Sequence, residues 1–237
     1  NAVNIQGTQA QVTAALVTDE TKVTASTATV QLDDGETPSI TQLNNIAAAA
    51  GVVTASLAAN SLSNLGALTT ASTDQITITV NDDAGDTLNA TDLSTLGGKT
   101  AATATVSNAV VISGTQAQVT AALVTNETKV TAANALVTVS DNAGVNLNAE
   151  DLSAIGGATG GTVTVTNAVN IQGTQAQVTA ALVTDATKVT ASTATVQLDD
   201  GETPSITQLN NIAAAAGVVT ASLAANSLSN LGALTTA

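Results

Sequence analysis

The chain lacks several residue types on which most folded proteins depend. Its 237 residues include no phenylalanine, tryptophan, tyrosine, cysteine, methionine, histidine or arginine. Any core must therefore be built from valine, leucine, isoleucine and alanine, without the aromatic groups that supply much packing energy. The side chains that most often act as acids, bases or nucleophiles are also missing. We therefore expect no enzyme.

Positive charge is scarce as well. Four basic residues oppose 18 acidic ones, which gives a net charge of −14. This balance excludes nucleic acid as a direct partner and disfavours anionic membrane surfaces. No apolar run approaches about 20 residues, so we expect no membrane insertion. An acidic surface suits solubility in salty water and the binding of divalent cations, and the lack of cysteine fits a bacterial extracellular protein.

What the chain does contain is repetition. Residues 1–71 return as 167–237 with one change, from Glu20 to Ala186, so the period is 166 residues. We expect one continuous array over residues 1–237 that consists of about nine strand–helix units. Asn1 corresponds to Asn167, inside a repeat, and we therefore expect the sequence to be a segment of a longer repetitive chain.

A helix-start signal recurs nine times along the chain. In each case an N-cap residue is followed three positions later by a side chain that can bond back to the cap, as in a capping box. We expect short helices of two to three turns that end at Gly51, Gly66, Gly97–Gly98 or Gly156–Gly157. The nine pairs are Thr8 with Gln11, Ser39 with Gln42, Ser61 with Asn64, Asn89 with Asp92, Thr115 with Gln118, Asn148 with Asp151, Thr174 with Gln177, Ser205 with Gln208, and Ser227 with Asn230.

Alternating threonine and valine runs lie between these helices. Period-two alternation of β-branched residues predicts strands with one buried face. The segment 22–27 fits either a second strand or an extension of the strand that follows it. The predicted strands are residues 28–32, 76–80, 105–107, 136–139 and 162–166.

A unit of about 27 residues with one strand and one short helix cannot bury its own apolar faces. Stacking solves this problem, with strands side by side and helices behind them. We therefore predict an α/β fold: a right-handed solenoid of strand–short-helix repeats with one continuous parallel sheet. Alanine-rich helices such as residues 47–50 would reduce the mismatch between the strand spacing of about 4.8 Å and the helix spacing of about 8–10 Å.

Acidic turns recur after strands and before helices. Hard oxygen ligands around a glycine turn are what Ca²⁺ requires, so these turns are candidate calcium sites. The same residues would also form solvated Asp/Asn/Gly turns that bind nothing. The candidate metal ligands are Asp33, Asp34, Glu36, Asp82, Asp83, Asp86, Asp141, Asp199, Asp200 and Glu202.

Threonine pairs two residues apart recur on the predicted strands, for example Thr77 with Thr79 and Thr103 with Thr105. Stacked strands would align them into a flat array, which resembles the surface of ice-binding solenoids. Threonine is also a favourable solvent-face residue in any strand, so the pattern does not by itself select ice.

The repeat motifs resemble those of a known class of proteins. The segments Gly7–Leu16 and Leu147–Gly156, alternating with Thr-Val strands, are similar to the tandem repeats of giant bacterial surface proteins, including those of marine cyanobacteria. This resemblance implies a secreted or cell-surface protein. We expect a structural segment of an extracellular filament, rod or spacer that associates with itself end to end or laterally. The alternatives are a calcium-stabilised adhesin stalk and a threonine-array ice-binding module.

Overall fold

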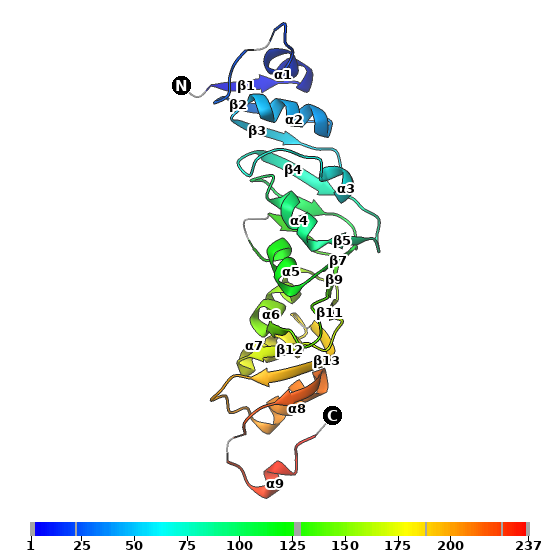
Figure 1. The fold of residues 1–237 in the computed structure, drawn as a ribbon, viewed down its shortest axis with the longest axis vertical. Helices are drawn as coiled ribbons and strands as arrows, with labels where there is room; N and C mark the ends of the chain where they lie inside the picture. Colours follow the sequence, from blue (N-terminus) through cyan, green and yellow to red (C-terminus); the bar gives the residue numbers. More distant parts are fainter. Residues whose placement is uncertain (1–2, 22, 126–128, 188, 224, 236–237) are drawn as a thin grey trace.

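The computed structural model describes residues 3–21, 23–125, 129–187, 189–223 and 225–235. The protein is elongated, and its short strands and helices follow one another along the long axis from the N-terminal end to the C-terminal end (Figure 1). Within the described ranges, the helices are all too short or too polar to cross a membrane.

Short helices begin at every predicted N-cap. The caps have extended backbone, and their side-chain oxygens accept a hydrogen bond from an amide of the first turn. The nine predicted helix starts are therefore confirmed. The helices are α1 (Gln9–Leu16), α2 (Ile40–Ala49), α3 (Leu62–Leu65), α4 (Ala90–Gly97), α5 (Gln116–Leu123), α6 (Ala149–Ala158), α7 (Gln175–Leu182), α8 (Ile206–Ala215) and α9 (Leu228–Leu231).

The reciprocal half of the capping box depends on side-chain length. It forms in α1, α2, α5, α7 and α8, where glutamine reaches back to the cap. The prediction is wrong for the shorter partners. Asn64 donates to Asn60 and Asn230 to Asn226, while Asn89 and Asn148 accept from the second helical residue instead of the third. Asp92 and Asp151 therefore do not play the role predicted for them.

The strands pair in parallel throughout the described ladders, but they form two sheets. One runs in the order β1 (Asn4–Gly7), β2 (Thr29–Leu32), β3 (Val52–Ser56), β4 (Gln75–Val80), β6 (Ala104–Val106), β8 (Val130–Thr131). The other runs β10 (Asn146–Asn148), β12 (Asn170–Gly173), β13 (Val189–Leu198), β11 (Val163–Val165), β9 (Leu136–Val139), β7 (Val111–Gly114), β5 (Thr87–Asn89), with β14 (Ala216–Thr220) also on β13.

The predicted single continuous sheet is therefore wrong, and the reason lies in the middle units. The unit with β6 and β7 carries two short strands separated by a bend, and so does the unit with β8 and β9. In both units the first strand joins one sheet and the second strand joins the other. What holds is the coarser prediction of a mixed α/β fold with parallel sheets.

The core is aliphatic and follows the predicted alternation. In β4, Ile76, Ile78 and Val80 are fully buried, whereas Thr77 is exposed. The buried side chains of the strands and helices form one cluster that continues from unit to unit along the protein. Neighbouring units therefore share their apolar interior.

One repeated segment adopts two structures. Residues 189–193 belong to β13, where Val189 and Thr190 pair with β11. The identical residues 23–27 are not a strand, and Val23 is 62% exposed whereas Val189 is 1% exposed. The sequence alone left this segment undecided because the strand forms only beside a neighbour that supplies hydrogen bonds.

The paired glycines of α6 have a different role from the predicted helix stop. The helix continues through Gly156 and Gly157 to Ala158. A Cβ on Gly156 would collide with the backbone carbonyl of Thr187, whereas a Cβ on Gly157 would meet only the Thr187 methyl group at 3.7 Å. Gly156 therefore allows the close approach of the next unit.

We predict opposite effects for alanine at these adjacent positions. Gly156→Ala should destabilise the protein by about 1–3 kcal/mol, because the added methyl group overpacks a backbone contact. Gly157→Ala is the matched control and should stabilise it by about 0.5–1 kcal/mol through helix propensity. Urea denaturation measures both changes, and equal effects at the two positions would show that close packing at Gly156 is unimportant.

Candidate functional site

The acidic turns share one backbone geometry. Gly35, Gly85, Gly144 and Gly201 have φ angles of +85°, +90°, +80° and +88°, which lie in the left-handed region that favours glycine. Each is the third residue of a turn closed by a backbone hydrogen bond, such as that from Glu36 N to Asp33 O (3.1 Å). Glycine at this place with positive φ is the signature of a type II turn.

A carboxylate near each turn contacts the preceding unit. Its oxygen accepts a hydrogen bond from the amide of the first residue of a helix that lies 20 to 27 residues earlier in the chain. The four bonds are Gln9 N to Glu36 Oε2 (2.9 Å), Leu62 N to Asp82 Oδ2 (2.7 Å), Gln116 N to Asp141 Oδ2 (2.6 Å) and Gln175 N to Glu202 Oε2 (3.0 Å).

Strand register explains why these groups meet. Gly7, just before the cap of α1, is opposite Leu32 at the end of β2, and Asp33 N donates to Gly7 O (3.0 Å). After β2, the chain turns beside the start of α1, so that the Glu36 carboxylate can accept the hydrogen bond from Gln9 N. Gly114 and Val139 are paired in the same way, with Asp141 two residues beyond the strand. Glu36 and Glu202 end their turns, whereas Asp82 and Asp141 precede theirs. The longer glutamate and the shorter aspartate side chains both reach the first amide of a helix.

These contacts satisfy donors that a helix cannot satisfy internally. The first four amides of a helix have no partner within it, and the helix dipole makes its N-terminus favourable for negative charge. A hydrogen bond to a charged acceptor contributes about 1.5–3 kcal/mol when buried and less when partly exposed, as here. Each turn therefore fastens one unit to the helix of the unit before it.

The other predicted metal ligands lie in or beside the same turns. Asp83 and Asp86 interact locally, because Asp83 N donates to Asp86 Oδ2 (3.1 Å). Asp33 is half-buried, and Asp34, Asp199 and Asp200 are exposed. The turn at Asp33 and the turn at Asp82 are separated by the unit with residues 57–60, which carry no carboxylate.

Within the described part of the chain, no three acidic residues are grouped so that they could hold a metal ion. Four of the predicted ligands already accept helix amides. Calcium binding therefore stays a prediction of the sequence, and the geometry gives it no added support.

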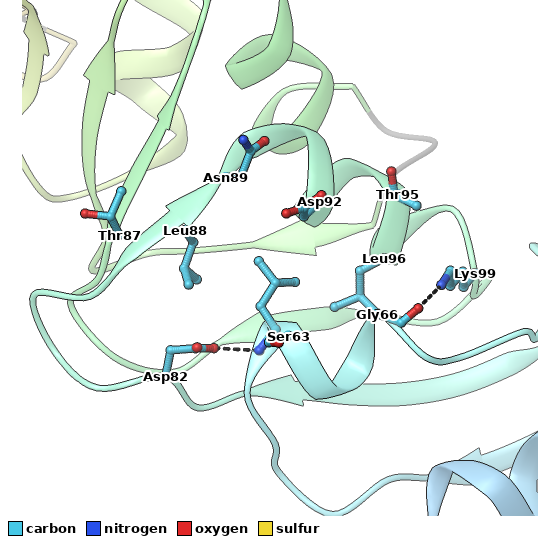
Figure 2. A pocket seen from close by; sticks show the side chains of 11 residues that line it. Ser63, Gly66, Asp82, Thr87, Leu88, Asn89, Asp92, Thr95, Leu96 and Lys99 are labelled. Atoms are coloured by element: carbon cyan, nitrogen blue, oxygen red, sulfur yellow. Dashed lines mark hydrogen bonds between the residues drawn. The ribbon is translucent and has the colours of Figure 1, made fainter.

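A concave surface lies between α3 and α4, and its volume is about 520 Å³ (Figure 2). Here both ends of the four-residue helix α3 are held by the following unit. Asp82 accepts from Leu62 N at the start, and Lys99 Nζ donates to Gly66 O (2.8 Å) at the end. The signs of both charges suit the helix dipole.

Sequence reasoning missed Lys99 and two buried polar residues. The sequence did set Lys99 apart, because the other three lysines, at residues 22, 129 and 188, occupy equivalent positions of the repeat and Lys99 does not. Asp74 is 4% exposed and accepts from Val53 N (2.7 Å) and Ala71 N (2.8 Å). Thr100 Oγ1 accepts from Ile76 N (2.9 Å) and donates to Ile76 O (2.7 Å). These residues also join neighbouring units.

Comparisons with protein-family models, with curated proteins and with solved structures find no match to this chain. The contacts described above are therefore the basis for any functional argument.

A matched pair of substitutions tests the role of the carboxylates. Glu36→Gln removes the charged acceptor of the Gln9 amide and should destabilise the protein by about 1 kcal/mol. Asp34→Asn removes the same charge from the same turn, where the side chain is exposed, and should change the stability by less than about 0.5 kcal/mol. Chemical denaturation of both variants measures the difference.

Calcium binding predicts another pattern. If Asp34 and Glu36 were joint ligands, the melting temperature would rise with CaCl₂ beyond its value in NaCl of matched ionic strength, and both variants would reduce that rise. Identical melting curves in the two salts, with only Glu36→Gln destabilised, would contradict calcium binding and support helix capping.

Proposed function

We propose that this chain is a structural repeat segment of an extracellular rod, filament or cell-surface spacer, in which units continue as a right-handed solenoid. The observation that carries this proposal is the return of the same pairing in the second copy of the repeat. Asn170 is opposite Thr195 as Asn4 is opposite Thr29, and Val196 is opposite Val219 as Val30 is opposite Val53. The two copies thus build the same layer at opposite ends of the protein (Figure 1).

The contacts between units favour a stiff assembly. Successive units share parallel strand pairs, an aliphatic interior and carboxylate-to-helix hydrogen bonds. Asn108 and Asn167 add a further contact, because their side-chain amides donate to the carbonyls of Asp82 and Asp141 in the unit before. Bending or separating two units would break several of these contacts together.

The composition supports a mechanical role over a chemical one. The chain has no histidine or cysteine, and four of its acidic groups make the same kind of contact between units. The extracellular location rests on the lack of cysteine and on the resemblance to tandem repeats of bacterial surface proteins. The rod would set the distance and stiffness between the groups at its two ends.

The length of the protein should grow linearly with the number of repeats. One period runs from β1 to its repeat, β12. The strands advance by five pairings from β1 to β8 in one sheet and by a sixth from β9 to β11 in the other. Strands β8 and β9 lie in one unit, and so do β11 and β12. At about 4.8 Å per strand, each added period of 166 residues should lengthen the rod by about 29 Å. Small-angle X-ray scattering of chains with one, two and three periods measures this increment. A maximum dimension that grew much more slowly would indicate compaction and contradict the rod.

A second candidate function has one specific observation in its favour. The outward threonines are aligned across strands: Thr79, Thr105 and Thr131 are consecutive partners in one sheet, and Thr138, Thr164 and Thr190 in the other. Thr131 Oγ1 donates to Thr105 Oγ1 (3.3 Å), so these hydroxyl groups are held in register. Ordered hydroxyl files of this kind are what an ice-binding face requires.

An ice-binding role predicts that the protein inhibits ice recrystallisation and that Thr105→Lys, in the middle of one file, abolishes much of this effect. Thr91→Lys is the matched control, because Thr91 is exposed on α4 and lies outside the files. Absence of inhibition by the unmodified protein at high concentration would rule this role out and leave the threonines as solvent-face strand residues.

A further inference from the structure

The last unit of the protein presents an exposed apolar surface. In the first copy of the repeat, the equivalent surface is covered by the unit that follows it. We define the C-terminal face as β14, α9 and residues 232–235. Leu228 of α9 is 87% exposed, whereas its equivalent in α3, Leu62, is 6% exposed. Helix α3 buries Leu62 and Leu65, but the identical helix α9 buries no residue.

Part of the C-terminal face already has the conformation of its covered first copy. Strand β14 keeps the register that β3 has on β2. Asn210 bonds to Ala233 O (2.9 Å) and Thr235 N (3.0 Å), as Asn44 bonds to Ala67 O (2.9 Å) and Thr69 N (2.9 Å). A hollow of about 330 Å³ lies on this face and is lined by Leu209, Val219 and Leu234, among others. A partner would therefore meet a surface that is formed in part, because β14 ends at Thr220 whereas the equivalent strand β3 continues to Ser56.

The protein itself shows what covers such a surface. In the first copy, residues 72–106, which we call the covering unit, lie on the equivalent face. Strand β4 pairs with β3 along Thr54–Ser56. Three charged side chains of the covering unit then satisfy three backbone groups: Asp74 accepts from Val53 N, Asp82 accepts from Leu62 N, and Lys99 donates to Gly66 O.

We propose that the C-terminal face is the docking surface for a strand–turn–helix unit with the chemistry of residues 72–106. Its strand pairs in parallel along Thr220–Ser222, which are the equivalents of Thr54–Ser56 and begin at the last residue of β14. An aspartate ahead of that strand accepts from Val219 N, a carboxylate after the strand accepts from Leu228 N, and a lysine beyond the helix donates to Gly232 O. This inference rests on the proposed rod, since it names the type of unit that continues the array.

A second copy of the same chain fits this surface less well. End-to-end association would place β1 on β14 and would cover the apolar area. Residues 3–18, however, carry no acidic or basic side chain. The strand β1 and the helix α1 of a second copy would then offer no carboxylate to the amides of Val219 and Leu228, and unsatisfied groups of this kind weaken an interface.

The absence of cysteine allows a direct test. Leu228→Cys places a single thiol on the C-terminal face, and its alkylation rate reports whether the face is covered. We would compare the full chain with two versions extended after Ala237 by 35 residues each. One extension copies residues 72–106, and the matched control copies residues 1–35. The rate for Leu62→Cys in the unextended chain gives the value for a covered site.

The expected result is that the extension with residues 72–106 slows alkylation toward the rate for Leu62→Cys, while the control extension leaves it near the rate of the unextended chain. The substitutions Asp74→Asn, Asp82→Asn and Lys99→Met, made together in the copied segment, should restore most of the reactivity. This last variant keeps the apolar residues of the extension. It therefore shows whether protection requires the three charged side chains or only the presence of an apolar unit.

Three results would overturn the proposal: equal protection by both extensions, protection by neither, or protection of the unextended chain that rises with its concentration and with light scattering. The last would identify a second copy as the partner. Failure here is distinguishable from failure of the rod, because the increment of length per period is measured independently of this face.

Discussion

The fold depends on one constraint: a unit of about 27 residues leaves both an apolar face and the first amides of its helix without partners. Each unit obtains these partners from the next one. Parallel strand pairing covers the edge of the sheet, and aliphatic side chains fill the shared interior. In the units of α1, α3, α5 and α7, a carboxylate of the following unit also accepts the first helix amide.

This dependence explains the unusual composition. Cores of valine, leucine, isoleucine and alanine suffice because the interior is thin and continues from unit to unit. Glycine occurs at tight approaches such as Gly156 and at the positive-φ positions of the turns. The acidic residues that dominate the charge are partly used as helix caps, and Lys99 serves the opposite end of α3.

The sequence predicted what depends on local chemistry. The nine helix starts and the strands with Thr-Val alternation, such as β4 and β9, were foreseen from caps and period-two patterns. Strands β1 and β12, with the sequence Asn-Ile-Gln-Gly, were missed because they lack this alternation.

The division into two sheets and the two structures of residues 23–27 and 189–193 depend on which neighbour is present, so no local pattern could predict them. The predicted metal ligands lie in or beside turns, and their binding of a metal stays a prediction. Four of these carboxylates accept helix amides of other units, and these partners were not foreseen.

Hydrogen exchange of the first helix amides tests the dependence of each unit on the next most directly. These amides are normally without partners and exchange quickly. The account predicts slow exchange for Gln9, Leu62, Gln116 and Gln175, whose amides donate to carboxylates of the following units. If these four amides exchanged as fast as those of the exposed first-turn residues Ala10 and Ala117, the carboxylates would not fasten the units together and the account would be contradicted.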